Sequence, residues 1–140
     1  MVKSSFNSDP FKKRLNRIRF RLRGRISGLL NEATDLAAER IAQSLKEQSI
    51  GKTYKRGNVT HIASAPGDAP NTDQGNLAKS IDQIDSTPAT LTSSLFVGGV
   101  QAPYASILEF GGNRIAERPF FFPAISLAKA LFLEKLDIIK

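Results

Sequence analysis

The sequence predicts an α+β protein: a long N-terminal helix, a small antiparallel sheet with short helices, and a C-terminal helix packed on the sheet. Three observations carry this prediction. Apolar residues recur every three to five positions over the first 45 residues, as on one buried helix face. Short runs rich in Thr, Ser and Val lie between Pro and Gly punctuation in the middle of the chain. Helical periodicity returns in residues 123–138.

Composition excludes several kinds of chemistry. A chain of 140 residues, 41% hydrophobic and 24% charged, fits one soluble domain. It has no cysteine and one histidine, His61, so disulfides and thiolate metal sites are excluded, and neither a zinc site nor a histidine base is expected. The start lacks the apolar run of a signal peptide, and no stretch approaches the ~20 apolar residues that span a bilayer. We therefore expect a soluble protein with no cofactor and no membrane partner.

Positive charge is concentrated at the N-terminus. Residues 1–25 carry nine basic side chains and one acidic, a net charge of +8, whereas the remaining 115 residues hold 11 basic and 12 acidic. We therefore divide the chain into a basic helical arm, residues 1–28, and one α+β domain, residues 29–140. Such an arm usually binds a polyanion: nucleic acid, membrane headgroups or an acidic protein face.

The first helix is predicted to begin at Ser8-Asp9-Pro10, where a capping side chain precedes proline. Its end is expected near Ser49, before Gly51. Glycine costs about 1 kcal/mol relative to alanine in a helix, so the sequence leaves open whether this helix is continuous or is bent or broken near Gly24 and Gly28. One face carries an apolar stripe: Phe11, Leu15, Ile18, Leu22, Ile26, Leu29, Ala33, Leu36, Ile41 and Leu45. Spacings of three and four place four arginines along one flank of it as candidates for an anionic partner: Arg14, Arg17, Arg21 and Arg25.

The stretch His61–Ile81 is the most distinctive part of the chain. A short strand is predicted at 58–64, after a turn at 56–58. Ala65-Pro66-Gly67 predicts a type II turn, because proline fixes φ and glycine permits positive φ. A short helix is expected at 76–81, capped by Thr72 or Asp73.

The second half of the chain predicts a hairpin and two helices. Residues 82–97 alternate around a Thr87-Pro88-Ala89-Thr90 turn, as in two paired strands. Residues 103–110 predict a helix of about two turns between Pro103 and a glycine pair, with Glu109 offset from its apolar seam. The proline-bound aromatic run 118–123 leads into a last helix at about 123–138.

Three segments share their order and spacing with one family. They are SAPGDAP with GNLAKSI at residues 64–81, VG with YA and LEFG at residues 97–111, and RPF with PA at residues 118–124. Over residues 50–135 the chain resembles the small head-to-tail joining, or tail-completion, proteins of long-tailed bacteriophages. The basic arm lies outside the matched region.

The resemblance implies a structural subunit of the virion neck, assembled in the host cytoplasm. It implies a homo-oligomeric ring, such as a hexamer, between a head-closure or connector protein and a tail-terminator or tail-tube protein. It implies neither catalysis nor a cofactor, and allows non-specific contact with DNA in the lumen. On this reading residues 29–140 form the ring-subunit domain, and we favour an acidic surface on the adjoining ring over DNA as the partner of the arm, because tight gripping would oppose DNA ejection.

Candidate subunit or partner contacts follow from the matched segments: Ser64, Pro66, Gly67, Pro70, Gly75, Tyr104, Glu109, Arg118, Pro119, Phe120 and Phe121. The fork of Arg118 suits a carboxylate such as Glu109 or Glu117, in the same subunit or the next. Phe120, Phe121 and Phe122 are candidate anchors, with at least one of them expected in the core. Tyr104 is expected in the core with a solvated hydroxyl.

Other classes of protein fit less well. The carboxylates have no spacing typical of a general acid/base pair, and the chain lacks a Gly-rich phosphate loop, so an enzyme is not expected. A small DNA-binding protein of nucleoid or regulatory type is the main alternative, because the arm can neutralise several phosphates. Against it, the rest of the chain shows no known nucleic-acid-binding motif. A basic amphipathic membrane helix is third, and it lacks a tryptophan anchor.

Overall fold

The first helix, α1 (Asp9–Ser44), is the longest element of the computed structural model, which describes residues 8–138. Pro10 lies in its first turn, where no helical hydrogen bond is lost by the missing N–H. The helix continues unbroken through Gly24 and Gly28, which answers the question that the sequence left open. It ends at Ser44 instead of near Ser49. The chain leaves the helix there, because Ser49 forms hydrogen bonds with Asn71 in the loop before α2.

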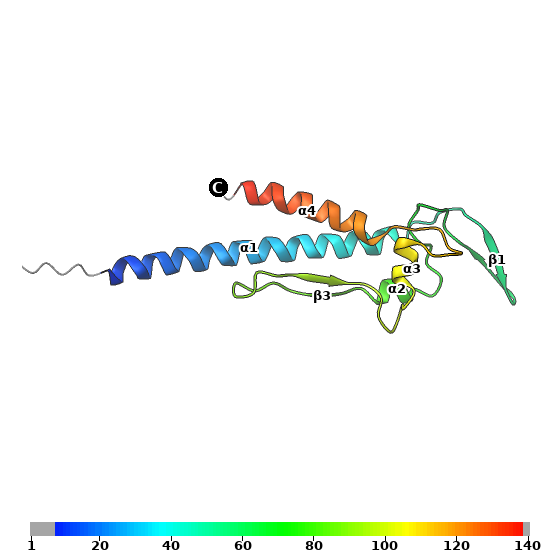
Figure 1. Ribbon diagram of the computed structural model, residues 1–140, viewed down its shortest axis with the longest axis horizontal. Coiled ribbons are helices and arrows are strands. Elements are labelled where there is room, and N and C mark those ends of the chain that lie inside the picture. Colours follow the sequence, from blue (N-terminus) through cyan, green and yellow to red (C-terminus); the bar gives the residue numbers. More distant parts are fainter. Residues whose placement is uncertain (1–7, 139–140) are drawn as a thin grey trace, which may run out of the picture.

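The remaining elements are short except for the last helix (Figure 1). In chain order they are β1 (Thr53–Arg56), β2 (Val59–Ile62), α2 (Asn76–Lys79), β3 (Asp82–Ile84), β4 (Ser94–Phe96), α3 (Ala105–Phe110) and α4 (Phe121–Asp137). The strands form two separate antiparallel pairs, β1 with β2 and β3 with β4. The fold class is therefore α+β, as predicted, with two hairpins in place of one small sheet.

Helix α4 lies along α1 (Figure 1) and does not pack on a sheet, as the sequence had suggested. The physical reason is the size of the available apolar surfaces. The described sheets have two short strands each, whereas α1 offers a long apolar face. Small buried residues, Ala124 and Ala128 on α4 and Ala37 on α1, favour close packing of helices. Lys135 also forms an ion pair with Glu32 of α1.

The core lies where the C-terminal part of α1 meets α2, α3 and the start of α4. Its buried members come from all four helices and from the segment before α3: Ile41, Leu45, Leu77, Ala102, Ala105, Phe120 and Ala124. Phe120 is 3% exposed, which confirms the prediction that at least one of the three consecutive phenylalanines is in the core. Tyr104 is 41% exposed, so its predicted place in the core is wrong.

The β3–β4 hairpin is attached to α1 mainly by polar contacts. The carbonyl of Ser86 accepts hydrogen bonds from Ser27 Oγ at 2.9 Å and Asn31 Nδ2 at 3.1 Å, and the Ser86 N–H donates to Asn31 Oδ1 at 2.6 Å. At the hairpin tip, Arg23 Nη2 donates to the carbonyl of Ala89 at 2.7 Å. The predicted hairpin is confirmed, with Asp82 opposite Phe96. These bonds fix the middle of α1 and leave its first turns free of the hairpin.

Candidate subunit interface

The loop before α2 contains the predicted type II turn. Gly67 has φ of +87°, and the Asp68 N–H donates to the carbonyl of Ala65 at 3.2 Å, which closes the turn around Pro66. The loop ends at Gly75, whose φ of +73° places it in the left-handed region at the N-cap of α2. The predicted cap by Thr72 or Asp73 is therefore wrong.

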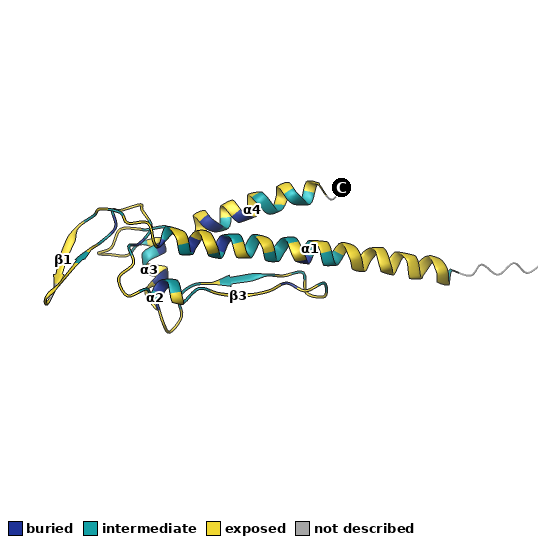
Figure 2. Cartoon of the chain, turned by 180° about the vertical axis from the view of Figure 1, so that it is seen from behind, coloured by how far each residue is buried: buried dark blue, intermediate teal, exposed yellow. Residues whose placement is uncertain are grey.

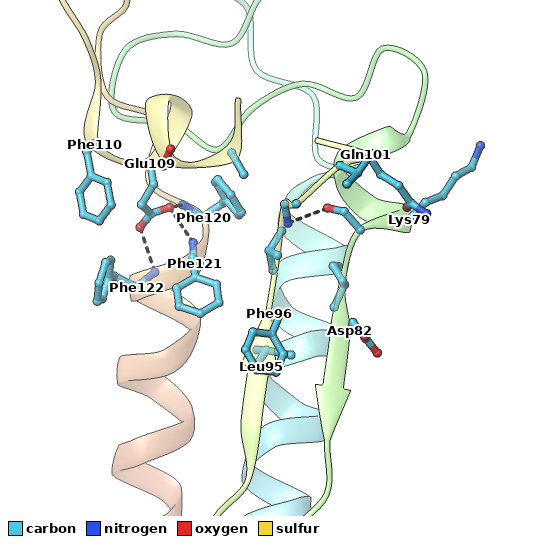
Figure 3. Close-up of a pocket in the computed structure, with 18 residues that line it drawn as sticks. Lys79, Asp82, Leu95, Phe96, Gln101, Glu109, Phe110, Phe120, Phe121 and Phe122 are labelled. Atoms are coloured by element: carbon cyan, nitrogen blue, oxygen red, sulfur yellow. Dashed lines mark hydrogen bonds between the residues drawn. The ribbon is translucent and has the colours of Figure 1, made fainter. Parts of the chain in front are cut away.

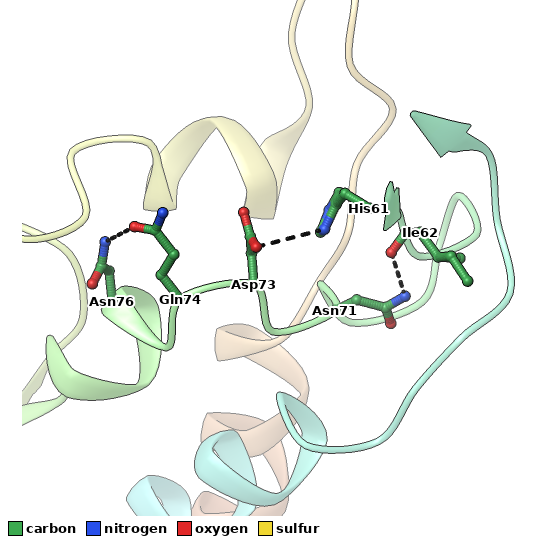
Figure 4. A network of polar contacts seen from close by, with 6 residues as sticks. All are labelled: His61, Ile62, Asn71, Asp73, Gln74 and Asn76. Carbon is green, nitrogen blue, oxygen red and sulfur yellow. Dashed lines mark hydrogen bonds and ion pairs between the residues drawn. The ribbon is translucent and has the colours of Figure 1, made fainter. Parts of the chain in front are cut away.

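Both predicted capping residues have other partners. Thr72 Oγ1 donates instead to the carbonyl of Leu45, where α1 ends. Asp73 Oδ1 lies 3.9 Å from His61 Nδ1 of β2 (Figure 4).

Ser49 and Asn71 hold this loop against the end of α1. The Ser49 N–H donates to Asn71 Oδ1 at 2.8 Å, and Asn71 Nδ2 donates back to the Ser49 carbonyl at 2.7 Å. Asn71 Nδ2 also donates to the carbonyl of Ile62 at 2.9 Å (Figure 4). Ser49 Oγ accepts from the Ala65 N–H at 3.0 Å and donates to Asp68 Oδ2 at 2.6 Å. The backbone of the loop is therefore held in place by side chains that precede and follow the β1–β2 hairpin in the sequence.

Arg118 fixes the loop from the other side. Its Nη2 donates to the carbonyl of Ser64 at 3.2 Å, and its Nη1 to the carbonyl of Ala116 at 3.3 Å. The Gly67 N–H donates to the carbonyl of Glu117 at 2.9 Å. The predicted pairing of Arg118 with a carboxylate of the same chain is therefore wrong: the guanidinium binds backbone oxygens.

Glu109 was predicted to lie at the surface of its helix, but it is buried. Its side chain is 7% exposed, and its Oε2 accepts the N–H groups of Phe120 and Phe121 at 2.8 and 2.9 Å. Its Oε1 accepts the N–H of Phe122 at 3.0 Å (Figure 3). These amides belong to the first turn of α4, where N–H groups have no helical partner and a negative charge is stabilised by the helix dipole. Glu109 is therefore an internal cap of α4 and lies inside the protein, not offset from the buried side of α3.

A groove of about 870 Å³ opens beside this cap (Figure 3). One wall is the β3–β4 hairpin and the segment after it, and the other is the end of α3 with the start of α4. Three phenylalanines of the walls are more than half exposed: Phe96 at 51%, Phe110 at 67% and Phe122 at 52%. We call this the phenylalanine groove. Side chains this large are usually buried, so the groove is a strong candidate for contact with another molecule.

The N-terminal part of α1 is the second exposed apolar surface. Every residue from 9 to 22 is exposed, which appears as the continuous yellow end of α1 in Figure 2. We call the side chains that form its apolar face the arm stripe: Phe11 at 61% exposure, Leu15 at 49%, Ile18 at 53% and Leu22 at 44%. Helical spacing sets Arg14, Arg17, Arg21 and Arg25 along one flank of the stripe, as predicted, and these four are exposed.

The candidate interface residues separate into three groups by exposure. Ser64, Pro70, Glu109 and Phe120 are buried within the chain, so they support the surface without reaching a neighbour. Gly75, Arg118, Pro119 and Phe121 are half-buried. Pro66, Gly67 and Tyr104 are exposed, and they are the members of the predicted set that a neighbouring molecule can contact directly.

No family model, no curated protein and no solved structure matches the chain. Among residues 8–138, no three His, Asp or Glu side chains gather in a group that could hold a metal ion. None of the described helices has the length and apolar character that crossing a membrane requires.

Sequence reasoning missed the phenylalanine groove and the hydrogen bonds of Ser49, Asn71 and Glu109. The groove has a partial signal, since Phe110 follows Glu109 directly and the run 120–122 was singled out as anchors. The hydrogen bonds have none, because Ser49 and Asn71 are 22 residues apart and Glu109 reaches 11 to 13 residues along the chain.

Proposed function

We propose that the chain is a ring-forming structural subunit of a phage neck that joins the DNA-filled head to the tail. One observation carries the proposal: the chain leaves large apolar surfaces uncovered at opposite ends of an elongated body. The arm stripe belongs to the N-terminal turns of α1, and the groove is lined by the end of α3 and the start of α4, which lie toward the other end of α1 (Figure 1). A protein built in this way is completed by association with other chains.

The rigid loop supports the same proposal. Pro66 and Gly67 form an exposed turn whose backbone is held by Ser49 on one side and by residues 117–118 on the other. A surface that is ordered before binding loses little conformational entropy on assembly, which favours a stable interface. The first of the three segments that resemble the phage family, residues 64–81, includes this loop.

The test is the solution mass and shape of the purified protein. We expect light scattering to give a closed oligomer at micromolar concentration and negative-stain micrographs to show rings with a central opening. We further expect the protein to restore head-to-tail joining in an extract from a phage that lacks its own tail-completion protein. A protein that is monomeric at all concentrations and inactive in the joining assay would refute the proposal.

A small DNA-binding protein is the second candidate, and the exposed basic helix favours it. The arm carries eight net positive charges, and five of its arginines are exposed on a helix long enough to lie along a duplex: Arg14, Arg17, Arg19, Arg21 and Arg25. On the neck proposal, DNA binding is weak, independent of sequence and steeply reduced by salt. Tight binding to one DNA sequence at physiological salt would favour this second candidate instead.

A further inference from the structure

The arm stripe is the continuation of the face of α1 that α4 covers. Leu29 and Leu36 follow Leu22 at helical spacing and are half-buried, and Glu32 on the same side forms its ion pair with Lys135 of α4. Helix α4 ends at Asp137 and does not reach the first turns of α1 (Figure 1). The arm is therefore an amphipathic helix whose apolar face is exposed, because α4 covers the same face only farther along α1.

The charge of the arm restricts what can cover it. A second arm would bring two segments of net charge +8 into contact, and this repulsion opposes pairing of like with like. The cover must instead be apolar at its centre and neutral or acidic around it. The remainder of the chain has a net charge of −1, which meets the second condition.

The phenylalanine groove meets both conditions. It offers the exposed rings of Phe96, Phe110 and Phe122, and its lining carries two acidic residues, Asp82 and the capping Glu109, against one basic residue, Lys79. Two further carboxylates lie beside the same strand: Gln83, which follows Asp82 in β3, donates from its Nε2 to Asp35 Oδ1 of α1 at 2.7 Å and to Asp85 Oδ1 at 3.4 Å. Within the described part of the chain, none of these three aspartates forms an ion pair.

Intramolecular docking is prevented by the continuity of α1. The helix has 36 residues and is therefore about 54 Å long at 1.5 Å per residue, and the arm and the groove lie toward its opposite ends (Figure 1). The arm cannot fold back onto its own groove without a break in the helix. Resting on the proposed neck function, we propose that the arm of one subunit docks in the phenylalanine groove of a second copy of the chain.

Such a contact joins two different surfaces, so it is head-to-tail. Each subunit then offers one free arm and one free groove, and repetition of the contact closes a ring when the rotation between neighbours permits it. In the docked state the arm stripe meets the three phenylalanines, and the flanking arginines lie beside Asp82 and its neighbours. The basic arm thereby becomes an element of ring assembly, and DNA is not its main partner.

Cross-linking between two separately purified variants tests the contact. Because the sequence has no cysteine, each variant carries a single thiol. Arg14→Cys places a thiol beside the arm stripe, and Ser106→Cys places one in the groove lining. We expect a short bismaleimide to join them in the mixed protein, with the linked peptides identified by mass spectrometry. Lys13→Cys is the matched control: it removes the same charge but lies on the opposite face of the helix, so its yield with Ser106→Cys should be several-fold lower.

A substitution in the stripe tests whether the contact drives assembly. Ile18→Glu should reduce the oligomer to monomers in light scattering, whereas Phe20→Glu, which adds the same charge on the opposite face, should leave the oligomer intact. Both side chains are exposed in the single chain, so neither substitution should lower the melting temperature of the monomer.

The outcomes distinguish this inference from the proposed function. If the wild-type protein forms rings, yet Ile18→Glu also does and the arm-to-groove cross-link is absent, the docking inference is wrong and the neck function stands. If Ile18→Glu leaves the rings intact and Arg17→Glu abolishes DNA binding, the arm is a DNA contact. If the wild-type protein is a monomer at all concentrations and inactive in the joining assay, both proposals are wrong; if it is a monomer that still restores joining, only the docking inference is wrong.

Discussion

The Phe120 N–H donates a 2.8 Å hydrogen bond to the carboxylate of Glu109, across the junction between α3 and α4. The same carboxylate accepts the next two backbone N–H groups, so one buried side chain occupies the N-terminus of the helix that covers α1. The positions of α3 and of α4 are therefore coupled, and the wall of the phenylalanine groove depends on that coupling.

Replacing Glu109 by glutamine should destabilise the protein. The amide has one acceptor oxygen in place of two, and its NH₂ group would face either the N–H of Phe122 or the N–H groups of Phe120 and Phe121. Leaving a buried donor without a partner costs about 1–3 kcal/mol, so we expect a fall of about 2 kcal/mol in the free energy of unfolding. Urea denaturation measures it. Glu117→Gln is the matched control, since Glu117 is exposed and has no side-chain hydrogen bond; equal stability of the two variants would contradict the capping role.

Replacing Gly67 by valine should impair assembly more than folding. A Cβ at Gly67 would meet no atom within 4 Å, so the substitution causes no clash, but the φ of +87° is unfavourable for a β-branched residue. We expect a loss of about 1–2 kcal/mol in stability, together with loss of the oligomer in light scattering, because the exposed turn changes shape.

Gly24→Ala serves as the control for this variant. It also adds a side chain to a glycine, but within a helix, where the substitution should raise the stability by about 1 kcal/mol. If Gly67→Val assembles as the wild type does, the turn is a plain connector.

Replacing Gly51 by alanine should destabilise the loop by a different route. A Cβ there would clash with the carbonyl oxygens of Ser64 and Ala63, the second of them at 2.6 Å, and both are backbone atoms that cannot move aside alone. The Gly51 N–H donates to the Ala63 carbonyl at 2.9 Å, so relief of the clash also breaks a hydrogen bond. We expect a melting temperature several degrees lower, since about 1 kcal/mol corresponds to a few degrees in a domain of this size. An unchanged melting temperature would contradict the steric role of Gly51.

Replacing Arg118 by alanine should loosen the loop from the segment before α4. The guanidinium is half-buried and binds the Ser64 and Ala116 carbonyls. A hydrogen bond from a charged donor contributes about 1.5–3 kcal/mol to stability when its geometry is good. Because these bonds exceed 3.1 Å, we expect a loss of about 1 kcal/mol, with faster amide hydrogen exchange in residues 64–68. Arg114→Ala is the control, since Arg114 is exposed and makes no side-chain hydrogen bond. Identical exchange in both variants would refute the role of Arg118.

The sequence by itself determined the elements whose causes are local. The periodicity of residues 9–44 specifies a helix because neighbours three and four apart share a face. The Pro66-Gly67 turn follows from the φ preferences of two adjacent residues, and the β3–β4 hairpin follows from alternation around a short turn. The charge difference between the arm and the remainder of the chain is also a property of composition alone.

Only the tertiary structure decided which surfaces are covered and which are left exposed. The sequence does not distinguish the arm stripe from the buried half of the α1 face, because both have the same periodicity; the difference is where α4 ends. Glu109 is an internal cap instead of a surface acid because α4 begins within reach of it, and Arg118 binds backbone carbonyls because the loop passes beside it. Such contacts join residues distant along the chain, and their energies depend on how the helices pack, which no local pattern records.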